Sequence, residues 1–307
     1  MKITNNHGLP ESFVAFAKAD KYSAGTADIS VTGLIDSPRV RILRRENAGE
    51  TEADVVDMVW ALFGTAVHHV LESSSDGEKV IQEERLFAEI GGWTVSGAID
   101  HQEVIDGKIQ ITDYKVTGAY SVIFGKKEWE LQQNCYAQLV RMAKGVEVSA
   151  IRICAIIRDW NRRKAMMEPE YPKTPVVVIE LPLWPSEVAH KYMLGRVAAH
   201  QSADMMFDHN GTEPLCSDEE RWLRGEKWAV MKGSAKRATK LCDTEQEAIE
   251  YVGDDKALRV EHRPGEYVRC DGDYCGVSEF CSQYRGRRPQ AQMVGVAPEE
   301  PTCVEAL

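Results

Sequence analysis

The sequence predicts an α/β fold with a mixed central sheet flanked by helices. Two observations predict it. Segments with helical and with alternating periodicity follow one another in the order helix, three strands, helix, strand. The last of these strands is apolar enough to be buried on both faces, as strands inside a parallel sheet are. At 307 residues, 43% of them hydrophobic, the chain can bury a sizeable core.

The first elements lead into this core. We expect loose structure over residues 1–28, which show no sustained periodicity. Residues 29–45 begin with a turn or cap signal and end with basic residues. Residues 52–74 carry apolar side chains at three- and four-residue spacing, which predicts an amphipathic helix.

Three strands joined by short turns follow this helix. Alternating segments predict them over residues 79–90, 92–105 and 108–117. The pair Asp106-Gly107, between the second and third strands, is a strong signal for a two-residue hairpin turn. If this turn forms, Ile105 pairs with Lys108, and the register of the whole hairpin is fixed.

Counting back along the hairpin places Asp100 opposite Asp113. Directly opposed residues have Cβ atoms roughly 4.5–5.5 Å apart, and two carboxylates at that distance suit one hard divalent cation, Mg²⁺ or Mn²⁺. Lys115 lies on the same face as Asp113 because side chains alternate along a strand, and the backbone carbonyl of Tyr114 remains available as a ligand. This arrangement suits phosphodiester hydrolysis. The alternative is a surface hairpin with solvated acids and an incidental lysine.

Two helices and two strands complete the predicted core, after which the composition changes. They span residues 126–144 (helix), 148–160 and 175–184 (strands) and 186–207 (helix). We therefore expect the core domain to cover residues 29–207, with a basic and cysteine-rich region, 208–285, packed on it. The tail, 286–307, has no periodicity and is predicted to be disordered.

Charge and hydropathy exclude several classes of protein. The net charge is −11, from 48 acidic and 37 basic residues, which argues against coating nucleic acid by bulk attraction. No run reaches the roughly 18 apolar residues of a membrane helix, and the N-terminus lacks the apolar core of a signal peptide. We therefore expect a cytoplasmic location and no membrane partner.

Four short motifs occur in order around the predicted hairpin. They are GTAVHHVLE at 64–72, GAID at 97–100, DYK at 113–115 and QQNCY at 132–136. Together they resemble motifs of the PD-(D/E)XK nucleases, and within them the RecB-like exonucleases of phage-encoded and CRISPR-associated types. The resemblance implies a restriction-endonuclease-like core and metal-dependent cleavage of DNA. It also implies a bacterial or phage-encoded role in recombination, end processing or replication.

The resemblance assigns roles to individual residues. The metal ligands would be His68, Asp100, Asp113 and the Tyr114 carbonyl, and the catalytic residues would be Asp100, Asp113, Lys115, Gln132 and Tyr136. Helical spacing places Gly64, His68 and Glu72 on one face, where the glycine would allow a close backbone approach. Taken alone, His68 is more typical of a core histidine than of a ligand, and Glu84 is either a supporting acid or a solvated one.

Eight cysteines without a secretion signal favour metal ligation or core packing over disulfides. Three lie close together in the sequence: Cys270, Cys275 and Cys281. RecB-like nucleases hold a 4Fe–4S cluster with three such cysteines and a fourth in an N-terminal Cys-Pro step, where this chain has Ser37-Pro38. We expect Cys216 to replace that ligand, with Cys242 as second choice. The site would hold a 4Fe–4S cluster or zinc and staple the C-terminal region to the core; a metal-free site is the third possibility.

The partner predicted from these features is DNA with a free end or a single strand. Residues 221–240 hold seven Lys or Arg against one Glu, with Trp222 and Trp228 among them. The basic side chains could contact DNA phosphates while the tryptophans stack on bases, or the segment could form a solvated helix anchored by its tryptophans. The basic runs 39–45 and 158–164 could border the same groove. We predict an exonuclease; the alternatives are a non-cleaving DNA-binding or assembly protein and a site-specific endonuclease. The sequence does not determine the oligomeric state.

Overall fold

The computed structural model describes residues 2–19, 25–73 and 79–285. The chain divides into two compact units, Met1–Pro214 and Leu215–Leu307. The first unit extends past the predicted boundary at residue 207 because its last helix continues to Asn210 and because buried Arg39 donates to the backbone of Glu213 and Pro214. The tail predicted to be disordered lies outside the described residues. Across the described ranges, the longest apolar stretch of any helix falls short of what a membrane crossing requires.

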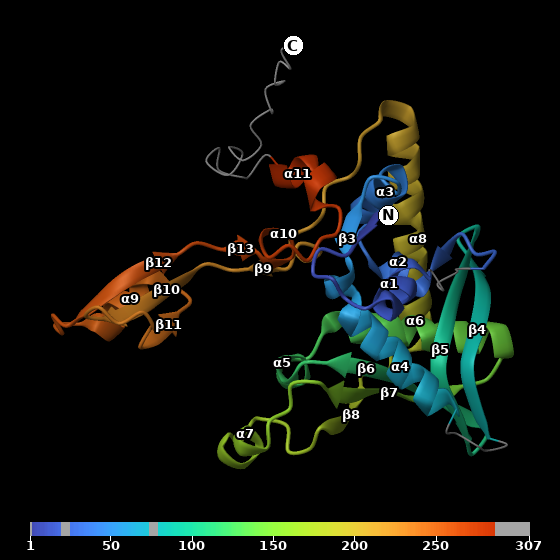
Figure 1. The fold of residues 1–307 in the computed structure, drawn as a ribbon, viewed down its shortest axis with the longest axis horizontal. Coiled ribbons are helices and arrows are strands. Elements are labelled where there is room, and N and C mark those ends of the chain that lie inside the picture. The colour runs from blue at the N-terminus through green and yellow to red at the C-terminus, as the bar shows by residue number, and fades with distance from the viewer. Residues whose placement is uncertain (1, 20–24, 74–78, 286–307) are drawn as a thin grey trace, which may run out of the picture. The chain divides into compact units, whose positions relative to one another are not determined.

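The first unit is built on one mixed sheet of six strands (Figure 1). The strands are β2 (Ile29–Ser30), β4 (Val80–Ile90), β5 (Trp93–Ile105), β6 (Lys108–Thr117), β7 (Val148–Ile157) and β8 (Val176–Leu181). Their order is β2-β5-β6-β7-β8, and β4 also pairs with β5. Strands β6 and β7 run parallel, which requires a crossover, and the chain between them contains α6 (Lys127–Lys144). The predicted mixed sheet with flanking helices is confirmed.

Helices cover both faces of this sheet. Besides α6, the helical elements of the first unit are α1 (Glu11–Lys18), α2 (Val31–Ile35), α3 (Pro38–Glu46), α4 (Val59–Ser73), α5 (Ala119–Phe124), α7 (Arg162–Met167), α8 (Ser186–Asn210) and the 3₁₀ turn η1 (Val55–Met58), some of which cover the sheet through other helices. Ile111 of β6 packs into the core with Tyr136 of α6. The Tyr114 side chain faces the opposite way, because its position differs from that of Ile111 by an odd number, and its ring lies edge-on to the His68 ring of α4, with centroids 6.1 Å apart. Helices α6 and α4 therefore lie on opposite faces.

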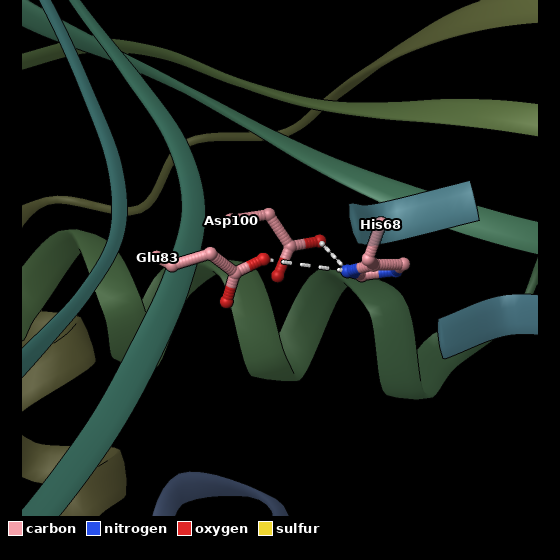
Figure 2. A group of neighbouring side chains, drawn as sticks. All are labelled: His68, Glu83 and Asp100. Carbon is pink, nitrogen blue, oxygen red and sulfur yellow. Dashed lines mark ion pairs between the residues drawn. The ribbon is translucent and has the colours of Figure 1, made fainter. Parts of the chain in front are cut away.

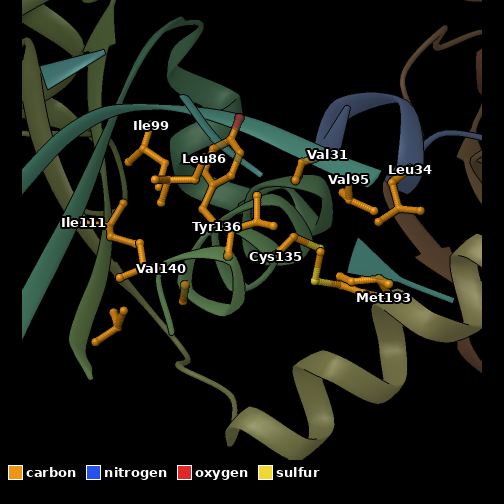
Figure 3. Packing of buried hydrophobic residues seen from close by; sticks show 14 of the residues in the cluster. Val31, Leu34, Leu86, Val95, Ile99, Ile111, Cys135, Tyr136, Val140 and Met193 are labelled. Atoms are coloured by element: carbon orange, nitrogen blue, oxygen red, sulfur yellow. The ribbon is translucent and has the colours of Figure 1, made fainter. Parts of the chain in front are cut away.

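The main core lies between the sheet and the helices α2, α6 and α8 (Figure 3). Its α6 side is formed by residues such as Cys135, Tyr136 and Val140, with Val140 near Ile111 of the sheet and Cys135 beside Met193 of α8. Burial raises the pKa of the Cys135 thiol to about 12, so this cysteine is a packing residue without thiolate character.

Gly97 on β5 allows the closest approach of α6 to the sheet. A Cβ at this position would lie 2.7 Å from Cε1 of Tyr136 and 2.9 Å from Cδ1 of Leu139. We expect Gly97→Ala to destabilise the fold by about 1–3 kcal/mol through overpacking, seen as a lower melting temperature in circular dichroism. Gly64→Ala on α4 is the control, because a Cβ there meets no atom within 4 Å and favours the helix. Equal melting temperatures for Gly97→Ala and the wild type would contradict this account.

The prediction of loose structure over residues 1–28 is wrong for much of this segment. Strand β1 (Lys2–Thr4) pairs in parallel with β3 (Glu52–Asp54), and α1 follows. Val14 and Ala17 of α1 pack on Val55 in a small separate core. A helix of eight residues shows only two turns of periodicity, too little to be recognised from the sequence. The predicted helix over 52–74 likewise begins later, at Val59, after β3 and η1.

The described part of the second unit contains two small sheets and several short helices. Its elements are β9 (Leu223–Arg224), β10 (Lys227–Lys232), β11 (Lys240–Cys242), α9 (Glu245–Val252), β12 (Leu258–Arg263), β13 (Glu266–Tyr267), α10 (Val268–Asp271), η2 (Ser278–Phe280) and α11 (Ser282–Arg285). Strands pair in the order β11-β10-β12, and β9 pairs with β13. The basic segment 221–240 is therefore β-structure and turns rather than a solvated helix. Trp228 packs on a small core that contains Cys242, which is thus a packing residue.

Candidate metal centre

The hairpin of β5 and β6 has the predicted register. Both residues of the Asp106-Gly107 turn have positive φ, and pairing runs from this turn back to His101 and Thr112. The next opposed positions are Asp100 and Asp113, where the described ladder between the two strands has ended. Farther along, β5 pairs on that side with the short strand β2 instead. The two strands therefore part at the acids, which opens the space for a site.

The pleat of β5 changes face at the same point. Ile99 and Val104 both pack against the main core, although their positions differ by an odd number, so the alternation shifts once between them. Asp100 lies in this shift. Its Oδ2 accepts the backbone N–H of Tyr114 at 2.9 Å, so a side chain takes the bond that a continuing ladder would have made.

Glu83 on β4 lies opposite this irregular part of β5. It was not predicted as a site residue. The β4–β5 register pairs Gln82 with His101 and Glu84 with Ile99, which leaves Glu83 opposite Asp100. Glu83 has φ of 47°, a left-handed conformation that is uncommon outside glycine. Strain of this kind persists where the surrounding structure enforces it, often at functional sites.

His68 of α4 joins the two acids (Figure 2). Its Nε2 lies 2.9 Å from the carbonyl oxygen of Tyr114, and a carbonyl only accepts, so Nε2 carries the hydrogen. Its Nδ1 faces the acids, 3.6 Å from Glu83 Oε1 and 3.6 Å from Asp100 Oδ2. One ligand atom from each of these three residues lies within 4.8 Å of the others. The group can therefore offer one ring nitrogen and two carboxylates to a single ion.

The pKa values of Asp100 and His68 are both raised in this group. The pKa of Asp100 is raised to about 7, mainly by burial and then by the nearby Asp113 carboxylate, against the opposing effects of His68 and Lys115. The pKa of His68 is raised to about 8, mainly by its bond to Glu83 and by Asp100, although burial acts the other way. The raised pKa values favour the protonated forms of Asp100 and His68. Because metal ligands bind in their deprotonated forms, cation binding would release these protons.

The buried Asp113 forms an ion pair with the partly exposed Lys115 beside this group. Lys115 Nζ lies 2.7 Å from Asp113 Oδ2, and the Asp113 side chain is 2% exposed. Burial lowers the pKa of Lys115, but the charges of Asp113 and Asp100 outweigh this, so the net shift is upward. Lys115 is therefore a fixed cation at neutral pH. Asp113 lies outside the His68–Glu83–Asp100 group, and its predicted role as a ligand stays a prediction.

The other predicted site residues are placed differently. The Tyr114 carbonyl accepts from His68 in this structure, and its predicted role as a ligand stays a prediction. Gln132 donates to the Tyr136 hydroxyl at 2.9 Å and to Thr32 at 3.4 Å, so it organises α6 rather than the acids. A Cβ at Gly64 would meet open space, so the close approach expected there is not made within this chain.

An open cleft of about 1210 Å³ runs along α4 to the group. Its floor includes Gly64, His68 and Glu83, and α1 lines it through residues such as Phe16 and Lys18. His69, 80% exposed in its side chain, also lines this cleft rather than serving the fold. The group is therefore reachable by a ligand from solvent.

Glu84 is the acid that the sequence singled out on β4, one position from the residue that joins the group. It accepts from Gln102 at 2.7 Å and pairs with Lys144 of α6. It is thus part of a polar network between β4, β5 and α6, neither a solvated acid nor a member of the metal group.

Comparisons with known proteins add little to this geometry. No protein-family model matches the sequence, and no curated protein matches it significantly. A solved structure named SSO0001 is 14% identical with a TM-score of 0.40, and the match covers 61% of this chain and 82% of that one. A protein from Eubacterium rectale named "Putative exonuclease" is 13% identical with a TM-score of 0.28, over 57% and 70% of the chains. Matches with TM-scores this low say nothing about function, so a functional conclusion has to come from the site itself.

The predicted cysteine site is not assembled as a zinc centre. All seven described cysteines are free thiols. Zinc–sulfur bonds of about 2.3 Å in a tetrahedron would bring thiolates within roughly 4 Å of each other. Within the described residues no three cysteine sulfurs lie within 4.8 Å of one another. The backbone of Cys216 is nevertheless bonded in both directions to the Gln283 side chain, next to the segment of Cys281.

The two basic runs predicted to border a groove have different surroundings in the structure. Much of the run 39–45 pairs within the fold: Arg39 is buried against Glu213, and Arg41 and Arg45 share Asp204 of α8. The run 158–164, in contrast, is exposed over Arg158 and over Arg162–Lys164. Of these two runs, only 158–164 presents most of its positive charge to solvent, where it could contact a ligand.

Proposed function

We propose that the chain is a divalent-metal-dependent deoxyribonuclease of the RecB-like type, acting in the cytoplasm on DNA with a free end. The observation that carries this proposal is the convergence of His68, Glu83 and Asp100 beside the Asp113–Lys115 ion pair. Carboxylates and an imidazole that meet where two strands part can hold an ion, and a fixed ammonium beside them can meet the charge of a phosphate.

The donor set favours Mn²⁺ over Mg²⁺. Two carboxylates suit either ion, whereas an imidazole nitrogen is a better ligand for Mn²⁺ than for the harder Mg²⁺. His68 Nδ1, Glu83 and Asp100 would hold the ion, with Asp113 adjacent. The ion, when bound, would polarise the scissile phosphate and lower the pKa of a water. Lys115 would stabilise the developing negative charge, because its raised pKa keeps it charged and makes it a poor base.

The test compares linear and closed circular DNA as substrates. We expect Mn²⁺, and Mg²⁺ at higher concentration, to support degradation of linear duplex or single-stranded DNA, and EDTA to abolish it. Closed circular DNA of the same sequence should persist. Cutting of the circle would assign a site-specific endonuclease instead. Binding of DNA without degradation under any metal would contradict the proposal and favour a non-cleaving DNA-binding protein.

We propose separately that Cys216, Cys270, Cys275 and Cys281 hold a 4Fe–4S cluster. Four thiolates are the donor set of such a cluster, and the cluster, larger than one zinc ion, separates its ligands more widely. Cys275 and Cys281 are buried, and the pKa of Cys275 is raised by burial and by its neighbours Cys270 and Cys281. Protein purified without oxygen should be brown and contain about four irons per chain. One zinc per chain, or no metal, would contradict this assignment.

A further inference from the structure

Two aromatic rings stand exposed on α5, directly after the strand that carries Asp113 and Lys115. The rings of Tyr120 and Phe124 are stacked, with centroids 6.1 Å apart and planes 8° apart. Tyr120 is 59% exposed and Phe124 is 80% exposed, the highest value among the large apolar side chains that the structure describes. Rings this exposed contribute little to the core, so their arrangement calls for a ligand with flat faces.

Cations are placed against the aromatic side chains of this region. Lys164 of α7 lies 5.9 Å from the centre of the Tyr120 ring. Arg158 lies 4.3 Å from the centre of the Trp60 ring at the start of α4, and Trp60 is itself 54% exposed. The surface formed by Trp60, Tyr120, Phe124, Arg158 and Lys164 is termed the aromatic–basic surface.

The chain connects this surface directly to the candidate metal centre. Strand β6 ends at Thr117, two residues after Lys115, and α5 begins at Ala119, whose N–H is held by Asp159 at 2.7 Å (Figure 1). The N–H of Arg158 donates to the carbonyl of Thr117 at 2.9 Å. On the other side, Trp60 precedes His68 by eight residues of α4, about 12 Å along the helix. A strand of a few nucleotides can span that distance.

We propose that the aromatic–basic surface binds unpaired nucleotides of a single DNA strand whose phosphate lies at the metal centre. Every base has a flat face that stacks on aromatic rings, and cations beside the rings meet the phosphates. Bases inside a duplex do not expose these faces, so the surface selects single-stranded DNA. The inference rests on the proposed function and adds its substrate class: an unpaired strand threaded past α5 to the cation.

The experiment measures binding of a fluorescein-labelled oligothymidylate to the full chain in EDTA, at one fixed salt concentration, by fluorescence anisotropy. The Tyr120→Ala/Phe124→Ala variant should raise the dissociation constant about tenfold or more, because stacking is lost. Tyr120→Phe/Phe124→Tyr keeps both rings and should bind like the wild type. Met205→Ala/Met206→Ala, which removes two exposed apolar side chains from α8, is the matched control and should also bind normally. Melting curves verify that each variant is folded.

The outcomes separate this inference from the proposed function. Unchanged oligothymidylate binding by the folded Tyr120→Ala/Phe124→Ala variant overturns the inference, whatever the result of the cleavage assays. An equal loss of affinity for a blunt duplex of the same length also overturns it, since the contacts would then not be to unpaired bases. A loss confined to the single strand supports it, even if substitutions at Asp113 leave cleavage intact and the proposed function fails.

Discussion

Replacing Asp113 with asparagine is expected to lower the rate of metal-dependent DNA cleavage by roughly a thousandfold or more. A bound cation stabilises the transition state by several kcal/mol, and each ~1.4 kcal/mol is a factor of ten in rate. Asp113 is adjacent to the metal group and also holds Lys115 at 2.7 Å, so this one change affects both. Lys115→Ala, which removes only the fixed cation, should cost roughly 10²–10³-fold. The measurement is the initial rate of nucleotide release from linear DNA at saturating Mn²⁺.

Asp106→Asn is the matched control for this experiment. It makes the same chemical change in the same hairpin, at an exposed turn position with φ of 50°, a conformation that asparagine also tolerates. Its cleavage rate should equal that of the wild type. Since Asp113→Asn leaves an ammonium without its partner, Asp113→Asn/Lys115→Gln, which keeps a neutral pair, is measured beside it. Wild-type cleavage by folded Asp113→Asn would exclude the proposed centre.

The hairpin shows why part of the site could be predicted from the sequence. The Asp106-Gly107 turn determines its register locally, so the pairing as far as His101 and Thr112 followed from counting. The alternation of a strand likewise predicted that Lys115 shares a face with Asp113, and the two do form a pair. Elements with long periodicity, such as α6 and β4 to β7, were also predicted within a few residues.

Glu83 shows what such counting cannot supply. Strict alternation on β4 gives no reason to choose Glu83 over Glu84, and the choice depends on a left-handed residue at position 83. That conformation is imposed by the tertiary structure where β5 changes face, not by a turn residue such as glycine. The prediction that the basic run 39–45 borders a groove met a related difficulty. Arg41 and Arg45 pair with residues of α8, more than 150 residues later, and only the fold brings them together.

Asp100→Asn is expected to abolish cleavage and yet to stabilise the metal-free protein at alkaline pH. The folded pKa of Asp100 is about 7, above the ordinary value of 3.8, so between these values the folded state binds more protons than the unfolded state. The free energy of unfolding therefore falls as pH rises through this window. About three pKa units correspond to an upper limit on the order of 4 kcal/mol, shared with the repulsion from Asp113. Asparagine avoids this cost and can still accept from the N–H of Tyr114.

Melting temperatures in EDTA at pH 5 and pH 9 test this directly. At pH 9 Asp100→Asn should melt several degrees above the wild type, about 2–4 °C for each kcal/mol, whereas at pH 5, partway down the window between 3.8 and about 7, the difference should be less than half as large. The raised pKa of His68 acts in the same direction, because its contribution to stability is lost as pH rises through about 8. Added Mn²⁺ should raise the melting temperature of the wild type more than that of Asp100→Asn, because only the wild type keeps both carboxylate ligands. If Asp100→Asn is less stable than the wild type at pH 9 without metal, Asp100 is a structural acid. The charge repulsion between Asp100 and Asp113 that a cation-binding centre requires would then be absent from this hairpin.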